Sequence, residues 1–204
     1  MNERYIRQTM IPEIGEAGQE KLKNAKVLIV GIGGLGSPIS LYLTAAGVGQ
    51  IGLIDDDIVS KSNLQRQILY TEAEIGQSKV ECACRRLSAL NSSTRFETYP
   101  NRFTPDNANR LVSAYDIIVD GCDNAATRYL IDDVCSRFKK PYVYGSISEF
   151  RGQVSVFNSR GGSRYSDLYP RPEVIPPARP GGVIGTIPGI IGCMEAAEVI
   201  KIIT

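Results

Sequence analysis

Residues 27–36 read Val-Leu-Ile-Val-Gly-Ile-Gly-Gly-Leu-Gly, and this stretch decides the fold. Four apolar residues ended by glycine are typical of a short strand that is buried on both faces of a sheet. A helix is predicted to follow over residues 35–46. Gly31, Gly33 and Gly36 have the G-x-G-x-x-G spacing, which permits a tight turn, close approach of the backbone to a phosphate, and close packing of helix on strand. Because free N–H groups at a helix start favour an anion, the stretch predicts a nucleotide site.

An acidic residue follows the next apolar run, residues 51–54. Asp55 comes 19 residues after Gly36, at the end of the second predicted strand, where a carboxylate can bind ribose hydroxyls. We add Asp57 to the expected nucleotide-binding residues. A merely tight strand-to-helix turn is the alternative, although strand, helix and acid together favour a nucleotide. The pattern does not distinguish NAD from ATP.

The rest of the chain alternates short apolar runs with helical patterns, which predicts a parallel sheet built of βαβ units. Residues 153–156 alternate polar and apolar, as a half-exposed antiparallel strand does, and residues 158–182 are expected to form a long crossover loop. We predict one α/β domain over 1–204, a Rossmann-like, mostly parallel sheet flanked by helices with an antiparallel extension. Its parts are an N-terminal helical segment 1–24, a nucleotide-binding core 25–150 and a final part 151–204. The other expected strands are 95–99, 117–119 and 142–144, and the other expected helices are 13–24, 60–69, 76–90, 124–138 and 188–203.

Composition excludes several classes of function. Lysine and arginine number 23 against 22 aspartate and glutamate, and a net charge of +1 argues against nucleic-acid binding. No apolar stretch approaches the ~20 residues of a membrane span, and the charged first residues do not resemble a secretory signal. Five cysteines without framework spacing favour a reducing, cytoplasmic setting. The chain has no histidine, which excludes a histidine base, triad or metal ligand.

Polar residues with the chemistry of a phosphate site follow the second strand. Asn63, Arg66 and Gln67 are spaced to share one face of a short helix. Lys79 falls in the first turn of the helix expected from Gly76, where a cation opposes the helix dipole unless a phosphate lies nearby. Taken singly, each of these residues is more often a solvated surface residue.

A carboxylate completes the pattern. Asp123 follows the predicted strand 117–119, at the carboxyl edge where open α/β sheets bind ligands. Its plainer interpretation is a helix N-cap, since a helix is expected from Asn124. Two cations and one hard carboxylate suit a triphosphate with Mg²⁺, whereas a dehydrogenase does not require them.

These motifs, in this order, resemble the ThiF/MoeB/HesA family, the bacterial relatives of the ubiquitin-activating enzymes. The resemblance runs from about Arg4 to the final helix. It is carried by Arg4-Tyr5-Ile6-Arg7-Gln8, the glycine stretch, Ser62-Asn63-Leu64-Gln65-Arg66-Gln67, Lys79 and Cys122-Asp123-Asn124. The family adenylates the C-terminal carboxylate of a small ubiquitin-like protein ending in Gly-Gly. The resemblance therefore implies an ATP-dependent adenylyltransferase that acts on a ThiS-like or MoaD-like sulfur carrier and releases pyrophosphate.

The resemblance also implies a role for each matching residue. Gly34 contacts ATP, Asp55 binds the ribose, and Asp123 holds Mg²⁺ with Asn124 beside it. Arg7 reaches into the ATP site of a partner subunit, which makes the functional unit a homodimer. Asn63, Arg66, Gln67 and Lys79 line the phosphates, and the expected catalytic residues are Arg66, Lys79, Asp123 and Arg7. A carboxylate nucleophile is already ionised at neutral pH, so a chain without histidine can carry out this reaction.

Two departures from the family pattern fall in the crossover loop. Many relatives bind structural zinc through a C-x-x-C pair where this chain has Arg164 and Asp167, and many have a loop cysteine where it has Ala178. We expect no zinc, a non-covalently held acyl adenylate, and a ThiF-type or HesA-type member. The loop arginines suit the covering of an extended C-terminal tail, the alternative being a solvated loop; they are Arg160, Arg164, Arg171 and Arg179.

The cysteines are expected to be mostly structural. Cys82 and Cys84 lie two apart on a predicted helix and so point to different faces. Cys135 and Cys193 have apolar neighbours and are predicted to be core residues. Cys122 stands next to Asp123 and could face the nucleotide, where a nucleophilic role is the less favoured interpretation.

Two other functions stay open at this point. An NAD-dependent oxidoreductase is supported only by the glycine stretch and Asp55. A catalytically inactive nucleotide-binding partner, or half of a heterodimer, is opposed by the intact set of Arg66, Lys79 and Asp123. The sequence does not choose between thiamine and molybdopterin pathways.

Overall fold

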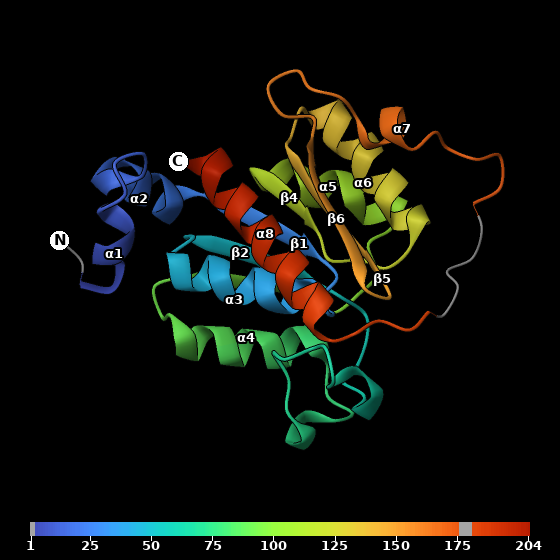
Figure 1. The fold of residues 1–204 in the computed structure, drawn as a ribbon, viewed down its shortest axis with the longest axis horizontal. Coiled ribbons are helices and arrows are strands. Elements are labelled where there is room, and N and C mark those ends of the chain that lie inside the picture. The colour runs from blue at the N-terminus through green and yellow to red at the C-terminus, as the bar shows by residue number, and fades with distance from the viewer. Residues whose placement is uncertain (1–2, 176–180) are drawn as a thin grey trace.

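The computed structural model describes residues 3–175 and 181–204. Its centre is a six-stranded sheet with the order β3-β2-β1-β4-β5-β6 (Figure 1). Strands β1 to β5 are parallel, and β6 runs antiparallel to β5, which confirms the predicted fold class. The strands are β1 Lys26–Val30, β2 Gln50–Ile54, β3 Arg95–Tyr99, β4 Ile117–Asp120, β5 Tyr142–Ser148 and β6 Arg151–Phe157.

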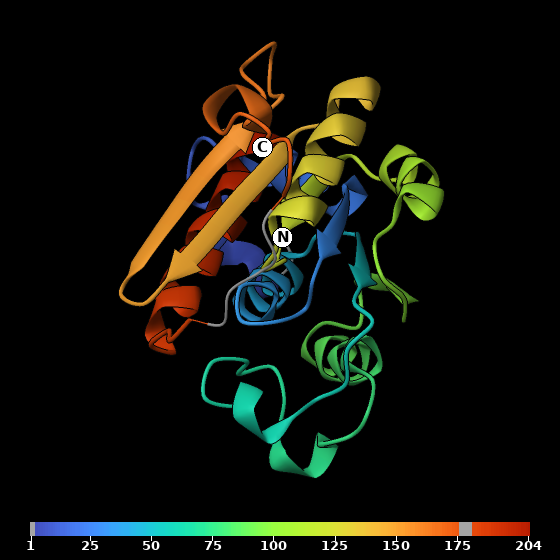
Figure 2. The same ribbon diagram turned by 90° about the vertical axis from the view of Figure 1, so that its right-hand side faces the viewer.

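Helices cover both faces of the sheet, and Figure 2 shows α8 and α6 on opposite sides of the β5–β6 pair. Helices α2, α3, α4 and α8 contribute to one buried cluster, and α5, α6 and α7 contribute to the other. The elements are η1 Glu3–Tyr5, α1 Ile6–Thr9, α2 Gly15–Asn24, α3 Gly36–Ala46, η2 Lys61–Asn63, η3 Glu72–Glu74, α4 Lys79–Leu90, α5 Pro105–Ala114, α6 Ala125–Phe138, α7 Tyr165–Leu168 and α8 Thr186–Ile203. Among the described residues, no helix has the length and apolar character needed to cross a bilayer.

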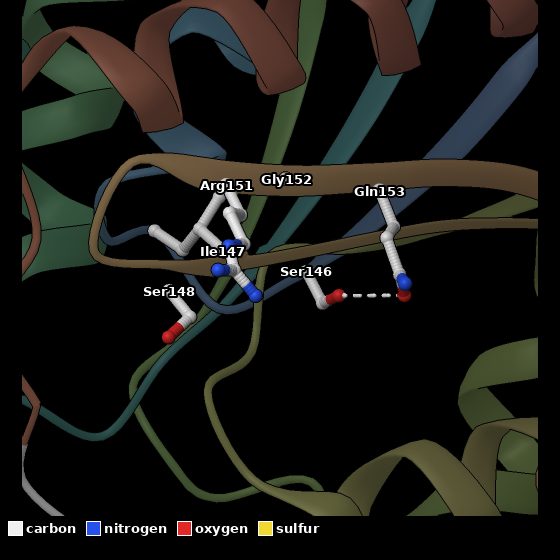
Figure 3. A pocket seen from close by; sticks show the side chains of 6 residues that line it. All are labelled: Ser146, Ile147, Ser148, Arg151, Gly152 and Gln153. Carbon is white, nitrogen blue, oxygen red and sulfur yellow. Dashed lines mark hydrogen bonds between the residues drawn. The ribbon is translucent and has the colours of Figure 1, made fainter.

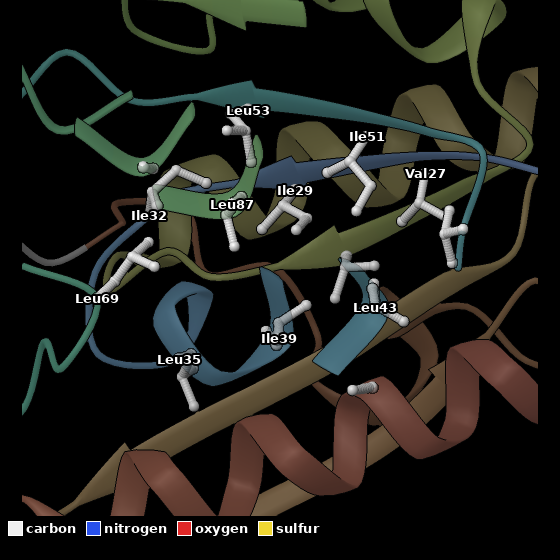
Figure 4. Close-up of a cluster of buried hydrophobic side chains, with 14 of the residues drawn as sticks. Val27, Ile29, Ile32, Leu35, Ile39, Leu43, Ile51, Leu53, Leu69 and Leu87 are labelled. Carbon is white, nitrogen blue, oxygen red and sulfur yellow. The ribbon is translucent and has the colours of Figure 1, made fainter. Parts of the chain in front are cut away.

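Alternating side chains of β1 fill both clusters. Val27 and Ile29 point into the core that β1 shares with α3 and α8 (Figure 4), while Leu28 and Val30 join the opposite cluster. All four are at most 3% exposed. Full burial of such a side chain contributes roughly 1.5–3 kcal/mol. The uninterrupted apolar run thus forms a strand that is buried on both sides, as predicted.

Several helical segments differ from the sequence-based expectation, among them α7, which lies within the loop expected over 158–182. Helix α5 was not predicted, although Thr104 and Asn107 form a capping box around its start and Pro105 is its first residue. The helix expected over 60–69 is a 3-10 turn, η2, followed by turns. Helix α4 begins at Lys79 instead of near Gly76, because Gly76 has a φ of +88°, outside the helical region.

The β5–β6 hairpin projects past the carboxyl edge of the parallel strands. Val119 pairs with Val143, and β4 ends one residue later at Asp120, whereas β5 continues to Ser148. Beyond the end of β4, β5 pairs only with β6. The hairpin therefore stands beside the loop that leaves the carboxyl end of β4.

Candidate active site

The glycine loop, residues 31–36, joins β1 to α3 through contacts of backbone on backbone. Gly31 has a φ of +91°, and a Cβ there would lie 2.6 Å from the carbonyl oxygen of Gly121. A Cβ on Gly36 would collide with the carbonyl oxygen of Gly31. Helix α3 has no side-chain cap at its N-terminus; in its first turn the Ser37 N–H donates to the Gly33 carbonyl at 3.0 Å, and Pro38 has no N–H. The tight turn and the close helix–strand packing predicted for the first and third glycines are therefore present.

Asp55 ties the end of β2 to the glycine loop. Its Oδ2 accepts a hydrogen bond from the Ile32 N–H at 2.7 Å, and its Oδ1 accepts from the Asp57 N–H at 2.9 Å. Burial raises the pKa of the Asp55 carboxyl, an effect that nearby Lys79 opposes. Each carboxylate oxygen retains a lone pair, so Asp55 can still accept a hydrogen bond from a ribose hydroxyl.

Lys79 is the first residue of α4 and is only 3% exposed. Its Nζ lies 2.8 Å from Asp57 Oδ2, and its backbone N–H donates to the Asp57 carbonyl. The sequence argument expected a phosphate to offset this cation at a helix N-terminus. In this structure the Asp57 carboxylate, whose side chain is largely exposed, provides the negative charge.

The segment with Asn63, Arg66 and Gln67 packs against the glycine loop. The backbone N–H groups of Arg66 and Gln67 both donate to the Asn63 carbonyl, so the three residues share one turn. Gln67 is 4% exposed, and its Nε2 lies 3.4 Å from where a Cβ of Gly33 would stand. The Cγ of Arg66 lies 3.6 Å from where a Cβ of Gly34 would stand. Gln67 Oε1 is buried and has no hydrogen-bond partner among the described residues.

Asp123 lies on the loop of residues 121–124, called here the Asp123 loop, which follows β4. It is exposed, and no hydrogen bond or ion pair of its side chain occurs within residues 3–175 and 181–204. The N-cap of α6 is Asn124, whose side chain accepts from the Thr127 N–H at 2.9 Å. The N-cap interpretation of Asp123 is therefore wrong. The loop touches the glycine loop, because the Gly121 N–H donates to the Val30 carbonyl at 2.7 Å.

Arg7 is the one expected site residue that lies elsewhere. It is exposed on α1, and the neighbouring Gln8 donates to the carbonyl of Ala46, at the C-terminal end of α3. The glycine loop is at the N-terminal end of the same helix, and the 11 residues of α3 span ~16 Å. Figure 1 likewise places α1 at the far end of α3 from the β1–α3 connection. The structure does not bring Arg7 to the glycine loop of its own chain.

Three charged residues near the Asp123 loop, two buried and one partly buried, were not predicted from the sequence. Asp120 is fully buried at the end of β4 and pairs with Arg128 of α6, Nε to Oδ2 at 3.1 Å. Glu195 of α8 is fully buried, and neither carboxyl oxygen has a hydrogen-bond partner among the described residues. Burial raises its pKa well above the usual range; Asp120 adds to this shift and Arg128 opposes it. For Asp120 a sequence signal was available, because this acid directly follows the apolar run 117–119.

Three of the cysteines agree with expectation. Cys82 and Cys135 are buried, while Cys84 is partly exposed on another face of α4. Burial raises the pKa of the Cys122 thiol well above its ordinary value, and nearby Asp120 adds to the shift. The core assignment of Cys193 is wrong, because its side chain is partly exposed in a groove between α3 and α8.

The residues at the positions of the zinc pair have another role. The backbone N–H of Arg164 donates to Asp167 Oδ2 at 2.7 Å, which forms a capping box for α7. The Arg164 guanidinium pairs with Asp132 and Asp133 of α6. Arg171 pairs with the same Asp133, so these two loop arginines are directed to α6. Ala178 and Arg179 lie outside the described residues.

Two hollows lie on the described surface, one on the β5–β6 hairpin and one along α3. One of about 280 Å³ lies on the β5–β6 hairpin (Figure 3) and is lined by Ser146, Ile147, Ser148, Arg151, Gly152 and Gln153. In Figure 3 the Ser146 and Gln153 side chains point the same way and are joined by a hydrogen bond. The other, of about 380 Å³, is largely apolar and is lined by Pro38, Leu41, Tyr42, Ala45, Ile68, Leu90, Gly189 and Cys193.

Comparison with known proteins gives a consistent result. The model of the ThiF family matches residues 5–204. The adenylyltransferase and sulfurtransferase MOCS3 of Culex quinquefasciatus is 49% identical over 98% of this chain and 46% of its own length. The sulfur carrier protein adenylyltransferase of Thermus thermophilus is 44% identical over 98% of this chain and 77% of its own. This chain therefore spans about half the length of the MOCS3 relatives.

Solved structures show the same architecture. The crystal structure of E. coli MccB with ATP superposes with a TM-score of 0.83, at 26% identity, over 100% of this chain and 64% of that one. MccB with the peptide MccA-N7isoASN gives a TM-score of 0.87 at 25% identity, over 100% of this chain and 65% of that one.

Proposed function

The chain belongs to the ThiF family, and from that premise we propose that it is an ATP-dependent adenylyltransferase for the C-terminal Gly-Gly carboxylate of a small ubiquitin-like sulfur carrier. The observation that carries the proposal is the convergence of Arg66, Gln67, Lys79 and Asp123 around one glycine loop. A carboxylate oxygen of the carrier bonds to the α-phosphorus of ATP as the bond to the bridging oxygen breaks. The products are the acyl adenylate and pyrophosphate.

The residues present fit a nucleoside triphosphate. A Cβ on Gly33 would approach Gln67, and a Cβ on Gly34 would lie 3.1 Å from Pro188 of α8 and 3.6 Å from Arg66. Because both positions are glycine, phosphate oxygens can approach the backbone at the start of α3. The unpartnered Gln67 amide oxygen lies at the same place and is free to accept a hydrogen bond. Asp55, at the end of β2, accepts from the ribose hydroxyls, with Asp57 beside it. Asn63 lies with Arg66 along the phosphates.

Asp123 fits a magnesium ion. Its carboxylate is exposed and unpaired within the described chain, and a hard oxygen ligand beside a phosphate site suits Mg²⁺. Asn124, the residue next to it, caps α6 and fixes the end of the loop. When bound, Mg²⁺ neutralises charge on the phosphate oxygens.

Charge neutralisation and positioning are the main contributions of this chain. The carboxylate nucleophile is ionised at neutral pH, so no general base is required. Lys79 and Arg66 offset the negative charge that moves to the pyrophosphate as it leaves. Burial keeps Lys79 in place before ATP arrives, and its ion pair with Asp57 is then shared with phosphate oxygens.

The hollow on the β5–β6 hairpin suits the carrier's tail. It lies where β5 extends past the end of β4, and it offers two serine hydroxyls, a glutamine amide and Arg151. An extended Gly-Gly tail presents peptide groups and a terminal carboxylate, which these side chains can hydrogen-bond. The tail's carboxylate is thereby directed toward the glycine loop.

We propose a homodimer in which Arg7 completes the partner's site. Arg7 lies at the opposite end of α3 from its own glycine loop, and an apolar groove with exposed Tyr42 and Ile68 is available for a second copy. Mixing Arg7→Ala chains with Asp123→Ala chains should restore up to one active site per heterodimer. Heterodimers with no more activity than their parents contradict action in trans.

The function is tested by pyrophosphate exchange with candidate carriers. We expect exchange of labelled pyrophosphate into ATP to depend on a carrier that ends in Gly-Gly. A carrier lacking the final glycine is the matched control and should give none. Calorimetry with ATP–Mg²⁺ and with NAD is the second arm: binding of NAD without ATP binding would contradict the proposal.

A further inference from the structure

The backbone on both sides of Asp123 is fixed by other side chains. The N–H of Cys122 donates to Asp120 Oδ1 at 2.9 Å, and its carbonyl accepts from Arg128 at 3.1 Å. On the other side, Asn124 caps α6 with its own side chain. The exposed carboxylate of Asp123 thus stands between two residues whose conformations are set by their surroundings.

Arg128 connects the Asp123 loop to the end of β4 and to β5. Its Nε donates to Asp120 Oδ2, and its Nη2 donates to the carbonyls of Cys122 and Gly145, the latter at 3.3 Å. The guanidinium carbon lies 5.4 Å from the ring centre of Tyr144. Only a planar guanidinium can reach a carboxylate and two carbonyls while stacking on a ring, and a lysine ammonium cannot.

Asp120 is held from a second side. The hydroxyl of Tyr142 donates to Asp120 Oδ2 at 2.9 Å, so this oxygen accepts from both Tyr142 and Arg128. Asp120 is fully buried and Arg128 is 15% exposed. A buried ion pair of this kind adds little net stability compared with apolar packing. The pair therefore matters chiefly for its contacts with the Cys122 backbone, which hold the Asp123 loop.

The Asp123 loop is in direct contact with the glycine loop. The Gly121 N–H donates to the Val30 carbonyl, and a Cβ on Gly31 would press on the Gly121 carbonyl. The position of the Asp123 carboxylate relative to the glycine loop therefore depends on how the Asp123 loop is held.

We propose that Arg128, acting through Asp120 and the Cys122 carbonyl, is the positioning residue that presents Asp123 to the metal ion of the metal–nucleotide complex. This inference rests on the proposed function. Since Arg128 acts on the loop that bears Asp123, its loss weakens binding of the metal and leaves binding of the metal-free nucleotide nearly unchanged.

The test is Arg128→Lys, with Mn²⁺ affinity measured by electron paramagnetic resonance in the presence of the ATP analogue AMPCPP. We expect at least tenfold weaker Mn²⁺ binding, with the affinity for metal-free AMPCPP within twofold of wild type. The Mg²⁺ concentration for half-maximal pyrophosphate exchange should rise by the same factor, with kcat largely recovered at saturating Mg²⁺. A merely structural role would lower the active fraction without moving these half-saturation values, and that result overturns the proposal.

Two further variants keep the test decisive. Arg137→Lys, an exposed arginine on the same helix that donates to Asn109, is the matched control and should bind Mn²⁺ as wild type does. If Arg128→Lys does not fold, Tyr142→Phe decides, because it removes one donor to Asp120 and preserves the buried ring. We expect about threefold weaker Mn²⁺ binding for Tyr142→Phe, and an unchanged value overturns the proposal.

Wild-type protein separates this inference from its premise. Wild type that binds no Mn²⁺–AMPCPP contradicts the proposed function and the inference with it. Wild type that binds the complex, loses it in Asp123→Asn and keeps it in folded Arg128→Lys contradicts the inference alone.

Discussion

The glycine loop and the Asp123 loop meet at one edge of the sheet, but they are held by different means. The glycine loop fits because side chains are absent: the carbonyl of Gly31 occupies space that a Cβ on Gly36 would need. The Asp123 loop is held by side chains, chiefly the buried Asp120–Arg128 pair. The glycine loop should therefore be disrupted by substitutions that add a side chain, and the Asp123 loop by substitutions that remove one.

The largest expected effect comes from removing the carboxylate. Asp123→Ala should reduce carrier-dependent pyrophosphate exchange by ~100-fold or more, which corresponds to about 3 kcal/mol of lost transition-state stabilisation. The free energy of unfolding should change by less than about 0.5 kcal/mol, because the side chain is exposed. Asp106→Ala, an exposed aspartate in the first turn of α5, is the control and should retain activity. Exchange within a few-fold of wild type would refute the role of Asp123.

Adding a methyl group to the glycine loop should have a smaller effect of another kind. Gly36→Ala brings Cβ against the Gly31 carbonyl, and such overpacking costs about 2 kcal/mol of unfolding free energy. Denaturant unfolding measures it. Gly181→Ala is the control, since a Cβ there meets no atom within 4 Å. Equal stability of the two variants would show that the loop can relax, and the contrast between the loops would weaken.

A third prediction concerns Glu195 of α8, which packs against Gly145 of β5. A Cβ on Gly145 would collide with the Glu195 carboxyl, and Arg128 donates to the Gly145 carbonyl. Because the folded pKa of Glu195 is raised, its contribution to stability is complete below the unfolded value near 4.5 and is lost as the pH rises through the folded pKa. Glu195→Met should therefore add about 1 kcal/mol of unfolding free energy at neutral pH.

The gain from Glu195→Met should shrink as the pH falls toward 4.5, the ordinary pKa of a glutamate side chain. Urea unfolding from pH 5 to pH 8 measures this dependence. Glu198→Met on the same helix is the control, since Glu198 pairs with Lys201 at the surface and should show little change. A gain that does not depend on pH would mean that Glu195 keeps the same protonation state in the folded and unfolded chain.

The smallest expected effect concerns the Cys122 thiol, which we expect to take no part in the chemistry even though the Cys122 backbone holds the Asp123 loop. Burial raises the pKa of this thiol, so little thiolate is available as a nucleophile at neutral pH. After incubation with ATP and carrier, denatured protein should carry no adduct that a thiol reagent cleaves, and metal analysis should find no stoichiometric zinc. A thiol-cleavable adduct would contradict the non-covalent adenylate, and stoichiometric zinc would contradict the zinc-free prediction.

The contrast between the loops also explains what could be predicted from the sequence. The glycine loop and Asp55 are local: strand, glycines, helix and acid lie within about thirty residues and carry their own signals. Asp120 and Arg128 are close in sequence too, yet their pairing depends on how α6 packs beside β4 and β5, which no spacing rule states. Glu195 is more remote, because its neighbours Gly145 and Asp120 come from two strands.

Other misses have simpler causes. Helix α5 carries a capping box, a proline at its start and one buried face formed by Ala108, Leu111 and Val112, so its signals were local and present in the sequence although no helix was predicted there. Cys193 has apolar neighbours in sequence, but one side of α8 faces a groove instead of the core. Arg7 is not a miss, because it was expected to reach a partner's site, and it lies at the far end of α3 from its own glycine loop.

The clamped backbone at Cys122 has a consequence for the entropy of ligand binding. Ordering a free loop on binding costs about 1–2 kcal/mol for each residue that is fixed. In the Asp123 loop that conformational freedom is lost when the chain folds, because Asp120, Arg128 and Asn124 restrain it without a ligand. Folding stability and ligand affinity thus depend on the same few contacts, and a substitution that loosens the loop shifts part of the ordering cost from the folding step to each binding event.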